Sequence, residues 1–561
     1  MKYMTFEWLN KDSRHFLKSG YLEEGVSPEQ RIREIADNAE KILGIKGYAD
    51  KFYDYMSKGY YSLSSPVWAN FGNKRGLPIS CYSVDIQDNF GDIMRAAGEV
   101  GVMSKLGGGT GGFFGKLRPR GAKIKGNGES SGAVHFVELF ESLMDVATQG
   151  SVRRGAFSPY LPVDHPDIEE FLKIGTEGNP IQKLTHAVTV TDEWMQQMID
   201  GDTDKRKIWA GVLQRRVEMG YPYIFFKSTV NNNTVDVYKD KGLEINHSNL
   251  CNEITLPTNE EWSFVCCLSS MNVLHYDEWK DTDAVEILTY FLDAVMEEFI
   301  VKLEAMRDSN DEEERQAFYF MKKAYNFAKS NRALGLGILG YHSYLQSNMI
   351  PFESIEASRK NIEIFRLIKE KSYKASEELA DIYGEPELLK GYGRRNSTLM
   401  AIAPTTSSAF ILGQVSQSIE PLFSNSYVKD LAKTKVTVRN QYLKEVLAKY
   451  KKDNRETWSS IRDYDGSVQH LDFLTEHEKN VFKTFSEIDQ YAILDQAAMR
   501  QQFVDQSQSL NLMINPSTSA KEINNLYIFA WQNGIKTLYY QHGTNAAQQF
   551  NKDLNCIMCE A

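Results

Sequence analysis

The sequence predicts a large protein of mixed α/β class. Its 561 residues exceed the size of one simple hydrophobic core, so we expect one large barrel with appendages or two to four domains. Apolar residues make up 42% and charged residues 25%, which is typical of globular proteins and excludes disordered, collagen-like and coiled-coil chains. From residue 60 onward, short apolar runs alternate with helical stretches, as in an α/β domain.

Residues 1–60 are predicted to be helical. Ser27-Pro28-Glu29-Gln30 combines a capping box with a proline at the first helical position. An apolar stripe follows, and Gly44 ends it. Little room is therefore expected before this helix for a separate N-terminal domain.

The rest of the chain divides into a mixed region and a polar tail. Segment 308–315 is highly polar and is expected to be a solvated loop or a helix start. After residue 540 the chain has almost nothing to bury, so we expect a mobile tail at 541–561. Strands are expected at 79–84, 185–191, 223–226, 264–268, 398–403 and 535–541, and helices at 90–105, 133–148, 284–306 and 358–383.

Charge and hydropathy restrict the location and partners. The net charge of -11 argues against coating nucleic acid, although a small anionic ligand stays possible. The N-terminus has no apolar segment of a signal peptide, and no apolar run is long enough to span a bilayer. We therefore expect a cytoplasmic protein.

The cysteines are the most informative residues. Six cysteines in a chain of this length without a secretory signal do not indicate a disulfide framework. In Asn249-Leu250-Cys251-Asn252-Glu253, an extended backbone would place the amide, the thiol and the carboxylate of the alternate residues on one face. Such a set suits a site that needs a sulfur reagent, a base and an orienting group. A polar edge with an incidental cysteine is the simpler alternative.

Three further cysteines lie in strand-like segments. Cys266 and Cys267 would point to opposite faces of a strand, so at most one of them faces a given site. Cys81 follows Leu77-Pro78-Ile79-Ser80. Ordinary core packing is the alternative for all three residues.

The chain ends with a C-x-x-C pair, Cys556 and Cys559. Half of a zinc site is one interpretation, but it needs two more ligands, and the tail offers only His542 at a distance. A dithiol that exchanges with disulfides is the interpretation that we favour.

Two segments have the composition of anion sites. The glycine-rich run 107–115 matches neither phosphate-loop fingerprint, and a plain flexible loop explains it equally well. Residues 404–408 place hydroxyls and free backbone N–H groups at a possible helix start, where a simple N-cap is the alternative. Tyr539-Tyr540 closes the last predicted strand. A tyrosine pair beside a thiol could relay a radical, and ordinary β structure, in which adjacent tyrosines are common, is the alternative.

Together these pieces resemble the large, catalytic subunit of class I ribonucleotide reductase. The resemblance covers nearly the whole chain, and the order of the motifs makes chance similarity improbable. The motifs are residues 249–254, 266–272, 395–399, 404–408, 418–421 and 536–541, the pair Ser80-Cys81, and the terminal cysteines.

The resemblance implies a ten-stranded α/β barrel of two five-stranded halves, with Cys251 on a central loop. The barrel would span residues 61–540, with effector and dimer helices at about 88–150, after a helical region at 1–60 and before a mobile redox tail at 541–561. The implied reaction reduces ribonucleoside diphosphates to 2′-deoxyribonucleoside diphosphates.

The resemblance also implies a role for each cysteine. Cys251 would carry a thiyl radical that removes the ribose 3′-hydrogen, while Glu253 takes the 3′-hydroxyl proton and Asn249 orients the sugar. Two thiols would supply the reducing equivalents and become a disulfide. These two thiols are Cys81 and Cys266. Cys556 and Cys559 would reduce their disulfide, and thioredoxin or glutaredoxin would reduce the tail. Tyr539 and Tyr540 would transfer the radical.

Binding residues follow from the same resemblance. A deoxynucleoside triphosphate or ATP effector would bind near Asp88 and Arg118 at a homodimer interface, where helices 90–105 and 133–148 would pair. The substrate would contact Ser65, Ser80, Thr405, Thr406, Ser407 and Ser408, and a specificity loop would comprise Ser151, Val152, Arg153, Arg154 and Gly155.

The sequence departs from many relatives at the N-terminus. The capped helix at Ser27 leaves no space for the ATP-cone, so we expect no dATP off-switch in this chain. The metal-radical cofactor would lie in a small partner subunit, with no metal bound tightly here. An adenosylcobalamin-dependent class II reductase and a catalytically silent nucleotide-binding scaffold are the alternatives; the tyrosine pair argues against the first, and the complete set of motif cysteines argues against the second.

Overall fold

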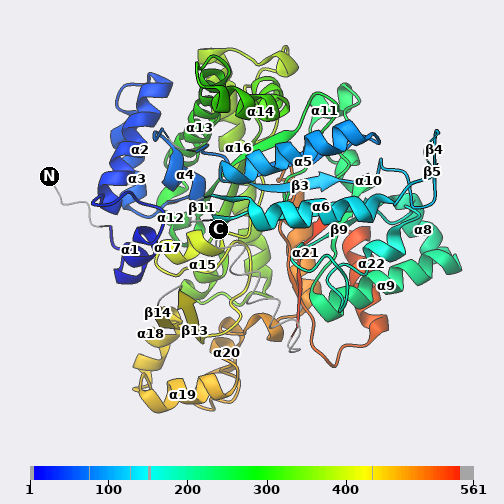
Figure 1. Cartoon of the computed structure of the whole chain (residues 1–561). Coiled ribbons are helices and arrows are strands. Elements are labelled where there is room, and N and C mark those ends of the chain that lie inside the picture. Colours follow the sequence, from blue (N-terminus) through cyan, green and yellow to red (C-terminus); the bar gives the residue numbers. More distant parts are fainter. Residues whose placement is uncertain (1–5, 75, 127, 150–152, 432–433, 544–561) are drawn as a thin grey trace.

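A curled nine-stranded sheet lies at the centre of the molecule (Figure 1). The computed structural model describes residues 6–74, 76–126, 128–149, 153–431 and 434–543. The strands follow the order β1-β11-β2-β3-β8-β9-β10-β16, and β12 pairs with β11. Their bounds are β1 Tyr61–Leu63, β2 Cys81–Asp85, β3 Gly109–Phe113, β8 Phe157–Pro162, β9 Ala187–Val190, β10 Tyr223–Phe226, β11 Phe264–Asn272, β12 Leu334–Leu339 and β16 Thr537–Leu538.

The strands form two parallel sets. Strands β2, β3, β8, β9 and β10 are parallel to one another, and β11 is parallel to β12. Isolated parallel bridges continue the second set from Leu336 to Met400 and from Ile402 to Gln508. The two sets meet antiparallel where β2 pairs with β11 and where β10 pairs with β16. This is the predicted arrangement of two half-barrels; the count of ten strands stays a prediction.

The N-terminal helices confirm the expected capping. Ser27 Oγ accepts a hydrogen bond from Gln30 N, and Gln30 Oε1 accepts one from Ser27 N. Gly44 ends the helix with φ 65°, in the left-handed region that glycine tolerates best. The helices of this region are α1 Lys11–Lys18, α2 Pro28–Leu43 and α3 Tyr48–Ser57.

Long helices surround the sheet (Figure 1). All four helices predicted in the mixed region are present, with ends that differ by at most three residues from the prediction. The polar connector ends in a helix start, because the Asp311 side chain caps α14. These helices are α5 Phe90–Lys105, α6 Ala133–Val146, α13 Ala284–Arg307, α14 Glu312–Asn331 and α16 Ile355–Tyr383.

Shorter helices and hairpins fill the connections. The helices are α4 Ser65–Asn70, α7 Ile168–Phe171, α8 Asp192–Asp200, α9 Thr203–Met219, α10 Lys227–Asn232, α11 Asp236–Asp240, α12 Tyr276–Trp279, α15 Tyr341–Ser347, α17 Thr406–Ile411, α21 Gln490–Gln501 and α22 Ala520–Gln532. The short strands are β4 Lys123–Ile124, β5 Gly128–Glu129, β6 Thr148–Gln149, β7 Arg153–Arg154, β15 Leu512–Met513 and β17 Gln541–His542.

A small lobe projects from the barrel and has its own core (Figure 1). Trp458, Leu443 and Phe482 are buried within it. No sequence pattern singled out this lobe. Its elements are β13 Ser426–Leu431, β14 Thr434–Arg439, α18 Gln441–Lys449, α19 Arg455–Asp463 and α20 Glu476–Val481.

The centre of the glycine-rich run is a buried strand, so its interpretation as a plain flexible loop is wrong. Its central part is β3, which pairs with β2 and β8. A Cβ atom on Gly111 would lie 2.2 Å from the carbonyl oxygen of Ser248 and 2.8 Å from Ser83 Oγ. The glycines are therefore required because another segment passes directly over this strand inside the barrel.

Within the described residues, no helix is both long and apolar enough to cross a membrane.

One buried carboxylate joins several elements outside the sheet. Asp293 on α13 accepts hydrogen bonds from Arg332 Nε at 2.9 Å, Arg395 Nε at 2.9 Å and Asn396 Nδ2 at 3.0 Å. The Asp293 side chain is only 3% exposed, and the Arg332 side chain only 5%. Glu297 also pairs with Arg332 at 2.7 Å, but its side chain is 39% exposed, so loss of Asp293 would remove the only buried carboxylate that compensates these charges among the described residues.

Asp293→Ala should therefore lower the free energy of unfolding by about 3–5 kcal/mol, the cost of breaking a buried ion pair. Thermal or denaturant unfolding of the purified chain measures this change. Glu169→Ala is the control, because Glu169 pairs with Lys207 on the exposed surface. An Asp293→Ala midpoint equal to that of the control would show that the buried network contributes nothing.

Candidate active site

A cavity of about 140 Å³ brings together most of the residues singled out from the sequence. Six segments that are separated in sequence contribute to its wall, which is why no single motif reveals it. The predicted site residues that line it are Ser65, Ser80, Cys81, Asn249, Cys251, Glu253, Thr405, Thr406, Ser407 and Ser408.

Cys251 lies on a turn, and the extended conformation considered for residues 249–253 is wrong. Asn252 adopts φ 64°, which asparagine tolerates better than most residues. Its Nδ2 donates hydrogen bonds to the carbonyl oxygens of Ile224 at 3.3 Å and Leu538 at 3.1 Å. The turn still directs Asn249, Cys251 and Glu253 into one cavity. The three residues are therefore grouped as predicted, although not by the alternation of side chains along a strand.

Asn249 stabilises the turn with one end of its amide. Its Oδ1 accepts hydrogen bonds from the backbone N–H groups of Glu253 and Ile254, each at 3.2 Å. Its Nδ2 is buried, and no described residue accepts a hydrogen bond from it. Because Asn249 lines the cavity, this donor is available to a bound ligand.

Glu253 is a buried carboxyl group in the cavity wall. Burial raises its pKa from 4.5 to about 7. Ser509 Oγ lies 3.3 Å from Glu253 Oε2 and 2.6 Å from the carbonyl oxygen of Cys251, so this hydroxyl links the thiol turn to the carboxyl group. A carboxyl group with this pKa can exchange a proton near neutral pH.

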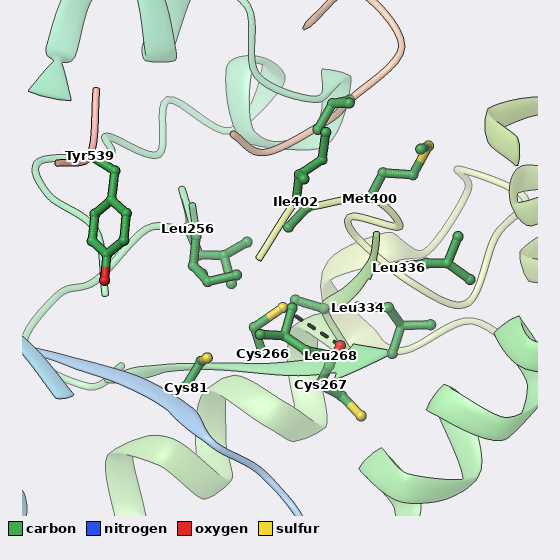
Figure 2. Close-up of a cluster of buried hydrophobic side chains, with 14 of the residues drawn as sticks. Cys81, Leu256, Cys266, Cys267, Leu268, Leu334, Leu336, Met400, Ile402 and Tyr539 are labelled. Atoms are coloured by element: carbon green, nitrogen blue, oxygen red, sulfur yellow. Dashed lines mark hydrogen bonds between the residues drawn. The ribbon is translucent and has the colours of Figure 1, made fainter. Parts of the chain in front are cut away.

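Cys81 and Cys266 are directly opposed on the antiparallel strands β2 and β11. Figure 2 shows Cys266 and Cys267 leaving β11 toward opposite sides, as predicted. Cys81 lines the cavity, whereas Cys266 is fully buried. Burial raises the pKa of the Cys266 thiol well above its ordinary value. Residues opposed in this way have their Cβ atoms about 4.5–5.5 Å apart, close to the separation in a disulfide.

Tyr539 and Tyr540 follow β16 and form an aromatic contact, with ring centroids 4.4 Å apart. Tyr539 is buried and Tyr540 is half-buried. Tyr223, whose ring the sequence did not single out, lies 4.6 Å from the Tyr539 ring and 5.1 Å from the Tyr540 ring. The preceding residue, Leu538, accepts the hydrogen bond from Asn252, so the tyrosines and the Cys251 turn are held together.

The hydroxyl-rich segment 404–408 forms another wall. Thr405 adopts φ 55°, a conformation that is strained for a β-branched residue, and α17 begins directly after it. Thr405 Oγ1 accepts a hydrogen bond from Ser418 N at 2.8 Å, which fixes this strained residue.

The predicted effector residues do not line this cavity. Arg118 Nε donates to Asp88 Oδ2 at 2.8 Å, so the two residues form an ion pair near the start of α5. Arg153 and Arg154 form β7, which pairs with β6. Ser151, Val152, Cys556 and Cys559 lie outside the described residues.

Sequence reasoning missed Tyr160, Asn252, Gln506 and Ser509. Tyr160 OH donates to the carbonyl oxygen of Asn249 at 2.7 Å and lies 3.0 Å from Asn252 Oδ1. The signals in the sequence were weak: an asparagine beside the candidate cysteine, which tolerates left-handed turns, and a run of five polar residues at 505–509.

Comparisons with known proteins agree with this geometry. The family model for the ribonucleotide reductase barrel domain matches residues 79–203, 198–388 and 386–541, and the model for the all-alpha domain matches residues 8–76. A putative ribonucleoside-diphosphate reductase large subunit of Frog virus 3 is 36% identical over 90% of this chain and 89% of the viral protein. The large subunit of Invertebrate iridescent virus 3 is 31% identical over 97% of both chains.

A solved structure is also closely similar. The class Id ribonucleotide reductase alpha subunit of Actinobacillus ureae has 52% sequence identity and a TM-score of 0.90, covering 98% of this chain and 99% of that chain.

The raised pKa of Glu253 predicts a pH-dependent stability. Between pH 4.5 and about 7 the native state retains a proton that the unfolded state has lost, so stability falls as pH rises through this range. Glu253→Gln does not titrate, so it should gain about 2–3 kcal/mol relative to the wild type between pH 5 and pH 8.

Denaturant unfolding across this pH range measures the difference. The exposed variant Glu260→Gln is the control and should follow the wild type at every pH. A constant difference between Glu253→Gln and the wild type would contradict the raised pKa.

Proposed function

Because the chain belongs to the ribonucleotide reductase large-subunit family, we propose that its cavity performs the thiyl-radical reduction of ribonucleoside diphosphates. The observation that carries this proposal is the convergence of Cys251, Glu253 and the opposed pair Cys81 and Cys266 on one buried region. The products are 2′-deoxyribonucleoside diphosphates, the precursors for DNA synthesis.

Cys251 is proposed to remove the hydrogen from C3′ of the ribose. The position of Cys251 supports this role, because its thiol lines the same cavity as Glu253 and Asn249. Glu253 then takes the proton of the 3′-hydroxyl group, for which a pKa of about 7 is well suited. The free Nδ2 of Asn249 orients the sugar through a hydrogen bond.

Cys81 and Cys266 are proposed to supply the two electrons and two hydrogens of the reduction. Two S–H bonds break and one S–S bond forms, while the 2′-hydroxyl group leaves as water. Their direct opposition on β2 and β11 supports the pairing. Cys556 and Cys559 then reduce this disulfide by exchange, and a protein of the thioredoxin or glutaredoxin type reduces the tail.

The substrate phosphates are proposed to bind the wall at 404–408. Thr405, Thr406, Ser407 and Ser408 offer hydroxyls, and the start of α17 offers backbone N–H groups. Ser65 and Ser80 line the same cavity and would contact the nucleotide.

The radical is proposed to come from a small partner subunit that holds the metal-radical cofactor. Tyr540 and then Tyr539 would pass it to Cys251. The 4.4 Å ring separation and the decrease in exposure from Tyr540 to Tyr539 support this direction.

Allosteric control is proposed to act through a homodimer. Helices α5 and α6 expose large apolar residues, including Phe90 at 71% and Val146 at 76%, which an interface would cover. Asp88 and Arg118 would contact a deoxynucleoside triphosphate or ATP beside α5. The segment 151–155 would carry the effector signal to the substrate base.

Cys251→Ser should reduce turnover of CDP to background even with a chemical dithiol, because serine cannot form a comparable radical. The assay uses the purified chain with its small subunit. Cys267→Ser is the matched control, since Cys267 points to the opposite side of β11 and should retain turnover. Turnover by Cys251→Ser would refute the proposed role.

The double change Cys556→Ser and Cys559→Ser should spare turnover driven by dithiothreitol and abolish turnover driven by thioredoxin. The physical reason is that a small dithiol reaches the internal disulfide directly, whereas a protein reductant needs an intermediate thiol pair. Loss of both activities would contradict the relay.

A further inference from the structure

A short polar segment, residues 505–509, contacts both the Cys251 turn and Cys266 on β11. All five of its side chains are buried. Ser507 N donates to the carbonyl oxygen of Glu253 at 2.9 Å, and Ser509 Oγ donates to that of Cys251. Gln506 contacts the second element, because its Nε2 lies 3.5 Å from Cys266 Sγ.

The orientation of the Gln506 amide is set by its neighbours. Its Oε1 accepts a hydrogen bond from Thr255 N at 3.1 Å. Its Nε2 donates to the carbonyl oxygen of Leu334 at 3.0 Å and to Thr398 Oγ1 at 3.1 Å. A flipped amide would place N–H against N–H and oxygen against oxygen, so the N–H side faces Cys266.

This N–H group matters most when the sulfur is charged, because burial raises the pKa of the Cys266 thiol and the hydrogen bond from Gln506 lowers it. Gln506 Nε2 carries two hydrogens and has three neighbouring acceptors, namely Cys266 Sγ, the carbonyl oxygen of Leu334 and Thr398 Oγ1. A neutral thiol at Cys266 therefore receives only a shared hydrogen bond. A thiolate at Cys266 would draw the hydrogen bond toward itself, since hydrogen bonds to charged groups are roughly twice as strong as neutral ones.

The two sulfurs of the reducing pair also differ in access. Cys81 lines the cavity, whereas Cys266 is fully buried behind it. Gly335 packs so closely that a Cβ atom there would lie 3.0 Å from Cys266 Sγ. Cys81 has a polar neighbour as well, Ser80 Oγ at 3.6 Å, but this hydroxyl lines the cavity and is open to ligands.

We propose that Gln506 sets the direction of disulfide reduction: the incoming thiolate attacks Cys81 Sγ, and Cys266 Sγ leaves as a thiolate held by Gln506 Nε2–H. The Cys81–Cys266 bond breaks, its electron pair stays on Cys266, and a new S–S bond joins Cys81 to the reductant. The second thiol of the dithiol reductant then displaces Cys81. The dithiol is oxidised by two electrons, and its two protons pass to Cys81 and Cys266.

This inference rests on the proposed function, because it assumes that turnover oxidises Cys81 and Cys266. The test uses the full chain with Cys556→Ser and Cys559→Ser, so that the terminal thiols do not compete. One turnover of CDP with the small subunit and without reductant generates the internal disulfide. A brief pulse of 2-mercaptoethanol, an acid quench, alkylation and peptide mass spectrometry then locate the mixed disulfide.

We expect 2-mercaptoethanol on Cys81 and the alkyl group on Cys266. The reverse assignment, with 2-mercaptoethanol on Cys266, would overturn the inference and leave the proposed function intact. If the single turnover forms no disulfide between Cys81 and Cys266, the proposed function fails, and the inference fails with it.

A second measurement isolates Gln506. Gln506→Leu should slow reduction of the disulfide about tenfold, because the leaving thiolate loses a charge-assisted hydrogen bond, and should distribute the mixed disulfide over both cysteines. Gln508→Leu is the matched control: Gln508 is equally buried, but its amide contacts Arg500, Ala497 and Gln501 rather than a cysteine. Equal rates and equal sites of attack in Gln506→Leu and the control would overturn the inference. The mapping in the chain with Gln506 intact decides the question if Gln506→Leu does not fold.

Discussion

The left-handed turn at Asn252 is the constraint on which the site depends. Its side chain bonds to the backbone of β10 and to Leu538 in β16, while Tyr160 of β8 reaches its Oδ1. One residue thus fixes the turn against three strands. Because Leu538 directly precedes the tyrosine pair, the same contact ties the Cys251 turn to the segment that carries the tyrosines. Without this anchor, neither the thiol nor the carboxyl group of Glu253 would have a defined place in the cavity.

Space for this turn comes from the glycines of β3, since any side chain at Gly111 would collide with the carbonyl oxygen of Ser248. The turn is therefore packed inside the barrel rather than on its surface. Burial then determines the chemistry, because it raises the pKa of Glu253 toward neutrality and keeps the Cys266 thiol protonated. The thiol of Cys251 and the carboxyl group of Glu253 share one turn, whereas the opposed pair Cys81 and Cys266 is held by the strands β2 and β11.

The sequence predicted the elements better than their geometry. Strand 223–226, helix 90–105 and the capping at Ser27 rest on local patterns and were correct. The cysteine motifs identified the residues that meet in the cavity because the family resemblance supplied their pairing. The conformation at Asn252, the burial of β3 and the contacts of Gln506 were not predictable, since each depends on segments distant in sequence that meet only in the folded barrel.

Reduction of CDP by the purified chain with dithiothreitol and ATP tests the central claim most directly. The reaction would be run with the chain alone, with the chain and a radical-bearing small subunit, and with the chain and adenosylcobalamin. The account predicts turnover only with the small subunit, because the tyrosine pair carries the radical inward to Cys251. Turnover with adenosylcobalamin alone would contradict it and leave Tyr539 and Tyr540 with a purely structural role.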